Sequence, residues 1–160
     1  MIIGLPLYVS LVFGLTTAAT LFLFYRGLRM SNAATTRKQS IHVLRFLISW
    51  LVIQGFLTQY VYSTDTDSVP PKIVLFGILP MILGTAVLFL TRKGKGFVDS
   101  LPLAGLTMIN VVRIPVEVVL CWLFINGSVP EMMTFEGRNF DIIAGITAPL
   151  IAYFGVVKKK

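Results

Sequence analysis

The chain has 160 residues, of which 56% are hydrophobic and 13% are charged, and its formal net charge is +7. A soluble domain carries about one quarter charged residues, so this composition excludes an ordinary soluble domain and favours a membrane protein. A basic chain could bind nucleic acid, but the cations here lie between apolar stretches, and we expect no such partner. One cysteine and one histidine exclude an internal disulfide and a cysteine cluster, and we expect neither a metal site nor a cofactor.

Long apolar stretches recur five times along the chain. They cover residues 3–25, 43–62, 73–91, 101–126 and 140–157. A helix needs about 20 apolar residues to cross about 30 Å of hydrocarbon. The stretches show no alternating strand pattern, and lipid does not tolerate unpaired backbone groups. We therefore predict an all-α bundle of five transmembrane helices that forms a single domain over residues 1–160.

The basic residues gather in alternate gaps between the predicted spans. Those gaps, the start of the second span and the C-terminal tail carry Arg26, Arg29, Arg37, Lys38, Arg45, Arg92, Lys93, Lys95, Lys158, Lys159 and Lys160. Cytoplasmic loops are enriched in lysine and arginine, so the N-terminus is expected outside and the C-terminus in the cytoplasm. The first basic residue, Arg26, follows the first apolar run, which favours a retained helix over a cleaved signal. We expect a multi-pass protein of the inner (plasma) membrane.

The fourth apolar stretch carries Arg113 and Glu117 near its middle. Positions 99, 103, 106, 110, 113, 117 and 121 recur at helical spacing, so one face would combine these two charges with Asp99, Asn110 and Cys121. A charge at the bilayer centre costs from about 2.5 to more than 10 kcal/mol, so it faces the bundle interior and usually pairs. The spacing predicts an ion pair between Arg113 and Glu117.

Two interpretations of this pair remain open. In the first, the pair locks the fourth helix to its neighbours, through Gln54 for example. In the second, it lines a cavity that binds an anionic or polar ligand, or relays a proton through Glu117. Pro115 would supply a further acceptor for Arg113, because it frees the carbonyl of Val111.

A second polar cluster precedes the fifth apolar stretch. Asn139 is expected to cap that helix, and Asp141 suits its positive end. Capping does not account for Glu136 and Arg138. Glu117 falls on the outer half of its span, so we expect the two clusters to lie close together. The candidate ligand-binding residues are Asn110, Arg113, Glu117, Glu136, Arg138, Asn139 and Asp141.

Three further patterns bear on packing and partners. The basic residues around the start of the second span form a candidate seat for an anionic lipid. They are Arg37, Lys38, His42 and Arg45. Small residues are spaced for close helix packing in the first and fifth spans. They are Gly14 and Ala18 in the first span, and Ala144, Gly145, Ala148 and Ala152 in the fifth, which Pro149 is expected to interrupt. Gln54 is expected to form a hydrogen bond between helices.

The strings Arg-Ile-Pro-Val-Glu at 113–117 and Phe-Glu-Gly-Arg-Asn-Phe-Asp at 135–141 resemble those of a group of uncharacterised bacterial multi-pass membrane proteins. The resemblance covers residues 90–155. It implies no activity, because the group has none assigned. Members of the group continue into further apolar segments, so the resemblance also implies that this chain is short at its C-terminus.

Three functions follow as hypotheses. The leading one is a small membrane binding or transport protein in which Arg113 anchors a ligand and Glu117 is its charge partner. The second is a non-catalytic assembly partner that docks on another membrane protein through its small-residue faces. The third is a lipid-modifying intramembrane enzyme with Glu117 or Asp141 as general acid or base. The basic loops and the acids near Asp141 fall on opposite sides of the membrane, so we assign no catalytic residue.

Overall fold

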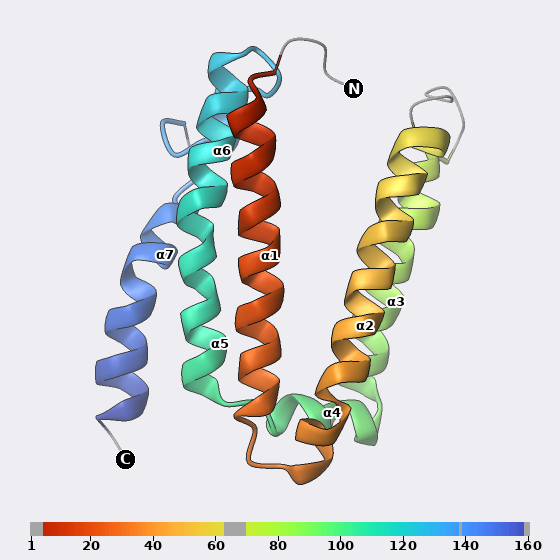
Figure 1. Cartoon of the computed structure of the whole chain (residues 1–160), viewed down its shortest axis with the longest axis vertical. Helices are drawn as coiled ribbons and strands as arrows, with labels where there is room; N and C mark the ends of the chain where they lie inside the picture. The colour runs from red at the N-terminus through yellow and green to blue at the C-terminus, as the bar shows by residue number, and fades with distance from the viewer. Residues whose placement is uncertain (1–4, 63–69, 138, 159–160) are drawn as a thin grey trace. The chain divides into compact units, whose positions relative to one another are not determined.

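The computed structural model describes residues 5–62, 70–137 and 139–158. All regular secondary structure in these ranges is helical, which confirms the predicted all-α class for the part of the chain described (Figure 1). Three helices are long and apolar enough to cross a membrane, or four if one bent pair counts as a single span. These lengths indicate a membrane protein. The chain divides into two compact units, Met1–Met30 with Pro102–Lys160 (unit 1) and Ser31–Leu101 (unit 2).

Unit 1 is built from α1, a long helix and a C-terminal helix. Its elements are α1 (Leu7–Arg29), α5 (Leu103–Ile109), η3 (Asn110–Val112), α6 (Arg113–Ile125), η4 (Glu131–Met133), α7 (Asp141–Leu150) and η5 (Ile151–Val157). The long helix consists of α5, η3 and α6 and is called the broken helix below, because a 3-10 turn interrupts it. Helices α5 and α6 run alongside α1 in the opposite direction, with α7 beside them (Figure 1). At one end Tyr8 of α1 meets Trp122 of α6 edge-on, with ring centroids 4.9 Å apart.

The helix Leu103–Ile125 fills most of the predicted fourth span, 101–126. It starts after Pro102, which has an extended backbone and lies three residues beyond the end of the preceding helix at Asp99. Asp99 therefore ends a different helix in unit 2, and its predicted place on the face of Arg113 is wrong. The helix tightens to a 3-10 turn at Asn110–Val112. Pro115 lies just beyond and lacks the N–H that would bond to Val111 in a regular α-helix.

Helix α7 packs closely against the broken helix through its small residues. A Cβ at Gly145 would lie 2.8 Å from Cγ1 of Ile114 and 3.2 Å from the carbonyl oxygen of Asn110. Ala148 and Ala152 are buried on the same side, as expected for the fifth stretch. Pro149 lies inside α7 and does not end it; the α-helical turns run to Leu150 and continue as the π-helical turns of η5. The apolar helix Asp141–Gly155 is shorter than the three long helices.

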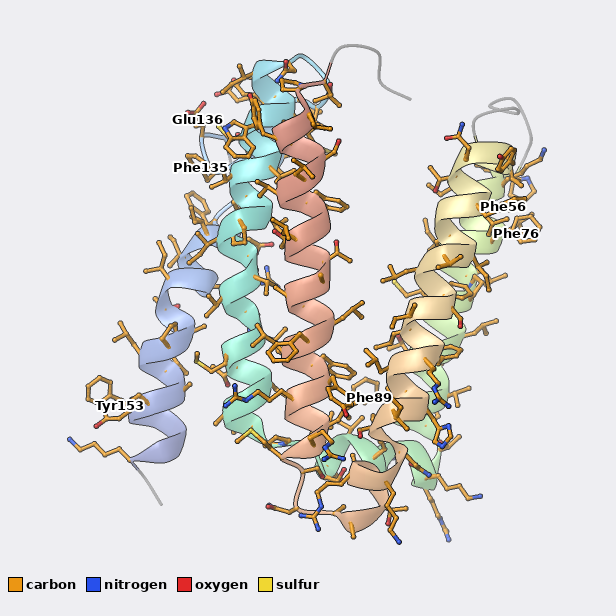
Figure 2. All side chains as sticks on the ribbon, in the orientation of Figure 1. Phe56, Phe76, Phe89, Phe135, Glu136 and Tyr153 are labelled. Atoms are coloured by element: carbon orange, nitrogen blue, oxygen red, sulfur yellow. The ribbon has the colours of Figure 1, made fainter. Side chains whose placement is uncertain are left out.

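Unit 2 has two apolar helical segments and a short amphipathic helix. They are α2 (Ala34–Leu57) with η1 (Thr58–Tyr62), η2 (Val74–Ile78) with α3 (Leu79–Leu90), and α4 (Arg92–Asp99). Nε2 of Gln54 donates to the carbonyl of Phe76 at 2.9 Å, which confirms the predicted hydrogen bond between helices. Phe56 and Phe76 lie at the same end of these segments (Figure 2). A bend of 85° at Thr91 separates α3 from α4.

Hydroxyl groups join the two ends of unit 2. Oγ of Ser31 donates to the carbonyl of Ser100 at 2.7 Å, and the Thr36 and Ser100 hydroxyls are 2.7 Å apart. Ser31 and Thr36 are almost fully buried, so these bonds satisfy polar groups that water does not reach. Unit 2 is thus a closed insertion whose first and last residues meet. The prediction of one domain over residues 1–160 stays a prediction.

Candidate functional site

The guanidinium of Arg113 binds two partners from different helical segments. Its Nη1 lies 2.5 Å from Oδ2 of Asp141, and its Nε donates to Oδ1 of Asn110 at 3.2 Å. Nδ2 of Asn110 in turn donates to the carbonyl of Thr107 at 3.2 Å. Asn110 therefore holds the guanidinium at the start of α6, where Asp141 at the start of α7 can reach it.

The predicted partner of Arg113, Glu117, is thus replaced by Asp141. The order arginine before glutamate is the less favourable one on a helix, so the pair within α6 gains little. Asp141 lies one helical turn before Gly145, whose missing side chain lets α7 approach α6. The packing of α7 on α6 therefore places the carboxylate of Asp141 next to Arg113. Residue spacing within a single helix cannot predict this pair.

Glu117 is the most deeply placed charged group of the site. It is 2% exposed, and its Oε1 accepts a hydrogen bond from Nδ2 of Asn139 at 2.7 Å. Its Oε2 is buried and has no hydrogen-bond partner within the described ranges. A buried carboxylate with an unpartnered oxygen is costly and uncommon, and such a group calls for a specific explanation.

Asn139 connects Glu117 to the start of α7. Besides the bond to Glu117, its Nδ2 donates to the carbonyl of Met133 at 3.1 Å. Its Oδ1 accepts the backbone N–H of Asp141 at 3.1 Å. Asn139 thus satisfies a free N–H group in the first turn of α7, but the N-cap residue of that helix is Phe140, one position later than predicted. The expectation that the two polar clusters lie close together is confirmed at this residue.

The loop before α7 takes its shape from two uncharged residues, Thr134 and Gly137. Thr134 is fully buried, its hydroxyl donates to Glu131, and its carbonyl accepts the N–H groups of Gly137 and Asn139 at 3.1 and 3.3 Å. A Cβ at Gly137 would lie 2.8 Å from Cα of Met132, so only glycine fits without a backbone shift. Sequence reasoning missed both residues as parts of the site. A glycine between polar residues was the available signal.

The other predicted site residues lie apart from this cluster or outside the described ranges. Glu136 is exposed and projects from the loop away from α6 (Figure 2). Arg138 falls outside the residues that the structure describes. The site that the structure assembles contains Asn110, Arg113, Glu117, Asn139 and Asp141. Its described residues hold one cation and two carboxylates, so this described set has an excess negative charge when both acids are ionised.

The candidate lipid-binding residues lie in unit 2, on the first turns of α2. Lys38, His42 and Arg45 are exposed and spaced four and three residues apart, so they share one helical face. Arg37 is also exposed, but its Nη1 donates to the carbonyl of Ser31 at 3.3 Å. Three of the four residues therefore form a basic stripe, and the fourth is held by the unit's own backbone.

No group of three or more histidine, cysteine, aspartate or glutamate side chains suited to a metal ion occurs among the described residues. Searches with the whole sequence and the structure found no matching family model and no significant match to a curated protein or a solved structure. The resemblance to bacterial multi-pass membrane proteins stays a prediction.

Proposed function

We propose that this chain is a small transport protein of the inner membrane in which Glu117 takes up and releases a proton. The observation that carries the proposal is the carboxylate of Glu117, which is buried and uses only one of its oxygens. Ionisable residues inside membrane proteins are costly, and proton relays are among the functions they commonly serve. A proton on Oε2 would remove the buried charge while Oε1 keeps its bond to Asn139.

The charge balance of the site favours a proton over an anionic ligand. Arg113 is the only cation of the cluster among the residues that the structure describes, and it is already paired with Asp141. An incoming anion would have to displace that carboxylate and would also meet the charge of Glu117. A metal ion fits less well than a proton, because hard cations take several oxygen ligands and the described residues offer no such group. The proton-relay form of the leading hypothesis is therefore the better supported.

We further propose five membrane crossings with the N-terminus outside. The three long helices, the bent pair and the helix Asp141–Gly155 supply five apolar segments. The bend at Thr91 ends the third crossing at Leu90, and α4 then carries Arg92, Lys93 and Lys95 along the surface as an amphipathic segment. In this orientation the loop before α7 faces outward, and Glu117 exchanges its proton from that side.

Assembly with another membrane protein remains a second proposal with narrower support. Ala148 and Ala152 are buried against helices of the same chain, so that face is not free for a partner. Gly14 and Ala18 on α1 are exposed, and a Cβ at Gly14 would meet no atom within 4 Å. The assembly hypothesis therefore rests on α1 alone. Crosslinking in native membranes through α1 tests it, and a strictly monomeric protein would count against it.

Infrared difference spectroscopy of the purified protein in liposomes tests the proton proposal directly. A protonated carboxyl group in an apolar site has a carbonyl band distinct from that of a carboxylate. We expect a pH-dependent band in the wild type that is absent from Glu117→Gln and retained in Glu131→Gln, whose side chain is exposed. A band that survives in Glu117→Gln would assign the proton to another group and overturn the proposal.

A further inference from the structure

A groove of about 540 Å³ opens in unit 1, where the last turns of α1 meet the first turns of α5 and the end of α7. Its volume lies within the range of about 300–1,000 Å³ typical of small-molecule sites. Leu23, Met30, Met108, Pro149 and Tyr153 supply apolar walls. Tyr153 projects from η5 at this end of the unit (Figure 2). The groove is distinct from the site of Glu117, none of whose residues lines it.

The groove exists because several residues of its lining are glycine or alanine. Gly27, Ala104, Gly105 and Ala152 all line it, and none of them has a side chain longer than a methyl group. At its floor the backbones of α1 and α5 approach closely, since a Cβ at Gly105 would lie 3.7 Å from Cα of Gly27. Larger residues at these positions would fill the space. The groove is therefore specified by the sequence and does not depend on the placement of one flexible side chain.

The charges around the groove have one sign. Arg26 is the only charged residue in its lining. Arg29 lies one turn further along α1, and Lys158 follows η5, where its Nζ lies 5.7 Å from the ring centroid of Phe154. None of the described acids of unit 1 lines the groove; they are Glu117, Glu131, Glu136 and Asp141. An apolar groove with cations near one end complements a molecule that has an apolar chain and an anionic head.

We propose that this groove binds an anionic phospholipid, with one acyl chain along the apolar walls and the phosphate against Arg26. The long apolar stem of an arginine lies along apolar surface while its guanidinium reaches the polar boundary, as this arrangement requires. Clusters of basic residues next to membrane helices attract anionic lipids. The groove adds an acyl-chain site to this attraction, and the site distinguishes a bound lipid from one that only surrounds the protein. This binding site is separate from the lipid site suggested by the basic stripe on α2.

The test measures lipid binding to the purified full chain by native mass spectrometry. Phosphatidylglycerol and phosphatidylcholine with identical acyl chains are compared for the wild type and three variants. We expect a preference for phosphatidylglycerol that falls about fivefold in Arg26→Gln, the effect expected for one cation near a lipid surface. Arg29→Gln removes a neighbouring cation outside the groove and should leave most of the preference. Ala104→Phe should reduce the binding of both lipids by filling the groove.

Two results would overturn the proposal. If Arg29→Gln weakens binding as much as Arg26→Gln, the attraction is general and the groove is not its site. If Ala104→Phe binds phosphatidylglycerol like the wild type, no acyl chain occupies the groove. Should Ala104→Phe fail to fold, Met108→Trp offers the same test from a more exposed wall position. A photoactivatable phosphatidylglycerol that labels none of the groove residues would count equally against the proposal.

Discussion

Asn139 donates a hydrogen bond to the buried carboxylate of Glu117 at 2.7 Å, and with its other side-chain atom accepts the first N–H group of α7. One amide therefore serves both the polar centre of unit 1 and the start of its last helix. The orientation of the carboxylate and the position of α7 are linked through this side chain. A change at either end is expected to affect the other.

Replacing Asn139 with alanine should destabilise unit 1. The change leaves both oxygens of Glu117 unpartnered and removes the bond to the first turn of α7, at a cost of about 1–3 kcal/mol. Denaturant unfolding in detergent, followed by circular dichroism, measures the loss. Asn126→Ala is the matched control, because that amide donates only to the carbonyl of Trp122 at an exposed helix end. Equal losses in the two variants would show that the bond to Glu117 carries no special weight.

A double-mutant cycle should assign the partner of Arg113. Arg113→Gln and Asp141→Asn remove the two charges of the observed pair, and their coupling energy is expected to fall between about 0.5 and 3 kcal/mol. The corresponding cycle of Arg113→Gln with Glu117→Gln should give a smaller value. Unfolding free energies of the single and double variants provide both numbers. A larger coupling with Glu117 would contradict the pairing described for α6 and α7.

Gly145 should not tolerate a side chain. In Gly145→Ala the added Cβ would meet Ile114 and the backbone of Asn110, and forcing the helices apart is expected to cost about 1–3 kcal/mol. Gly84→Ala is the control, since a Cβ there would meet nothing within 4 Å and alanine is the better helix former. Thermal unfolding should therefore show a lower melting temperature for the first variant only. A neutral Gly145→Ala would mean that α7 does not pack as closely as described.

Cysteine labelling should report the orientation in the membrane. Cys121 is the only cysteine, so Cys121→Ser gives a background without thiols. On that background, Glu136→Cys should react with a membrane-impermeant maleimide in intact cells. Lys38→Cys and Lys95→Cys should react only after permeabilisation. The reverse pattern would invert the proposed topology, and labelling of all three from one side would contradict the five crossings.

Much of the fold could be predicted, because it depends on local pattern. The apolar lengths predict helices, and Pro149 precedes by two residues the change from α-helical to π-helical turns at Ile151. Asn139 bonds to the first turn of α7 from one residue before the cap, Phe140. Gln54 was expected to bond to another helix because an unpaired amide is costly in lipid, and it does. In each case the chemistry of the residue itself indicates the local structure or the hydrogen bond that it forms.

Contacts between segments were predicted less well. Spacing along one helix suggests Glu117 for Arg113, whereas the partner is Asp141, which is 28 positions away and comes close through the packing of α7 on α6. The helical periodicity places Asp99 on the face of Arg113 only if one helix continues through Pro102, whereas the two residues belong to separate helices. Thr134 has no charge to signal its burial, and the groove beside Arg26 combines three separate segments. None of these features has a signature within a single stretch of sequence.

The insertion of unit 2 between α1 and α5 has a consequence for biosynthesis. A ribosome that adds about 5–20 residues per second needs about 4–14 s to make residues 31–101, which separate α1 from its packing partners. During that interval α1 is already synthesised while α5 and α6 do not yet exist. Unit 2 is contiguous and can pack first, whereas unit 1 must assemble around a helix that was made earlier. Asn139 is made later still, so Glu117 enters the membrane before its hydrogen-bond donor and is expected to cross the insertion machinery without it.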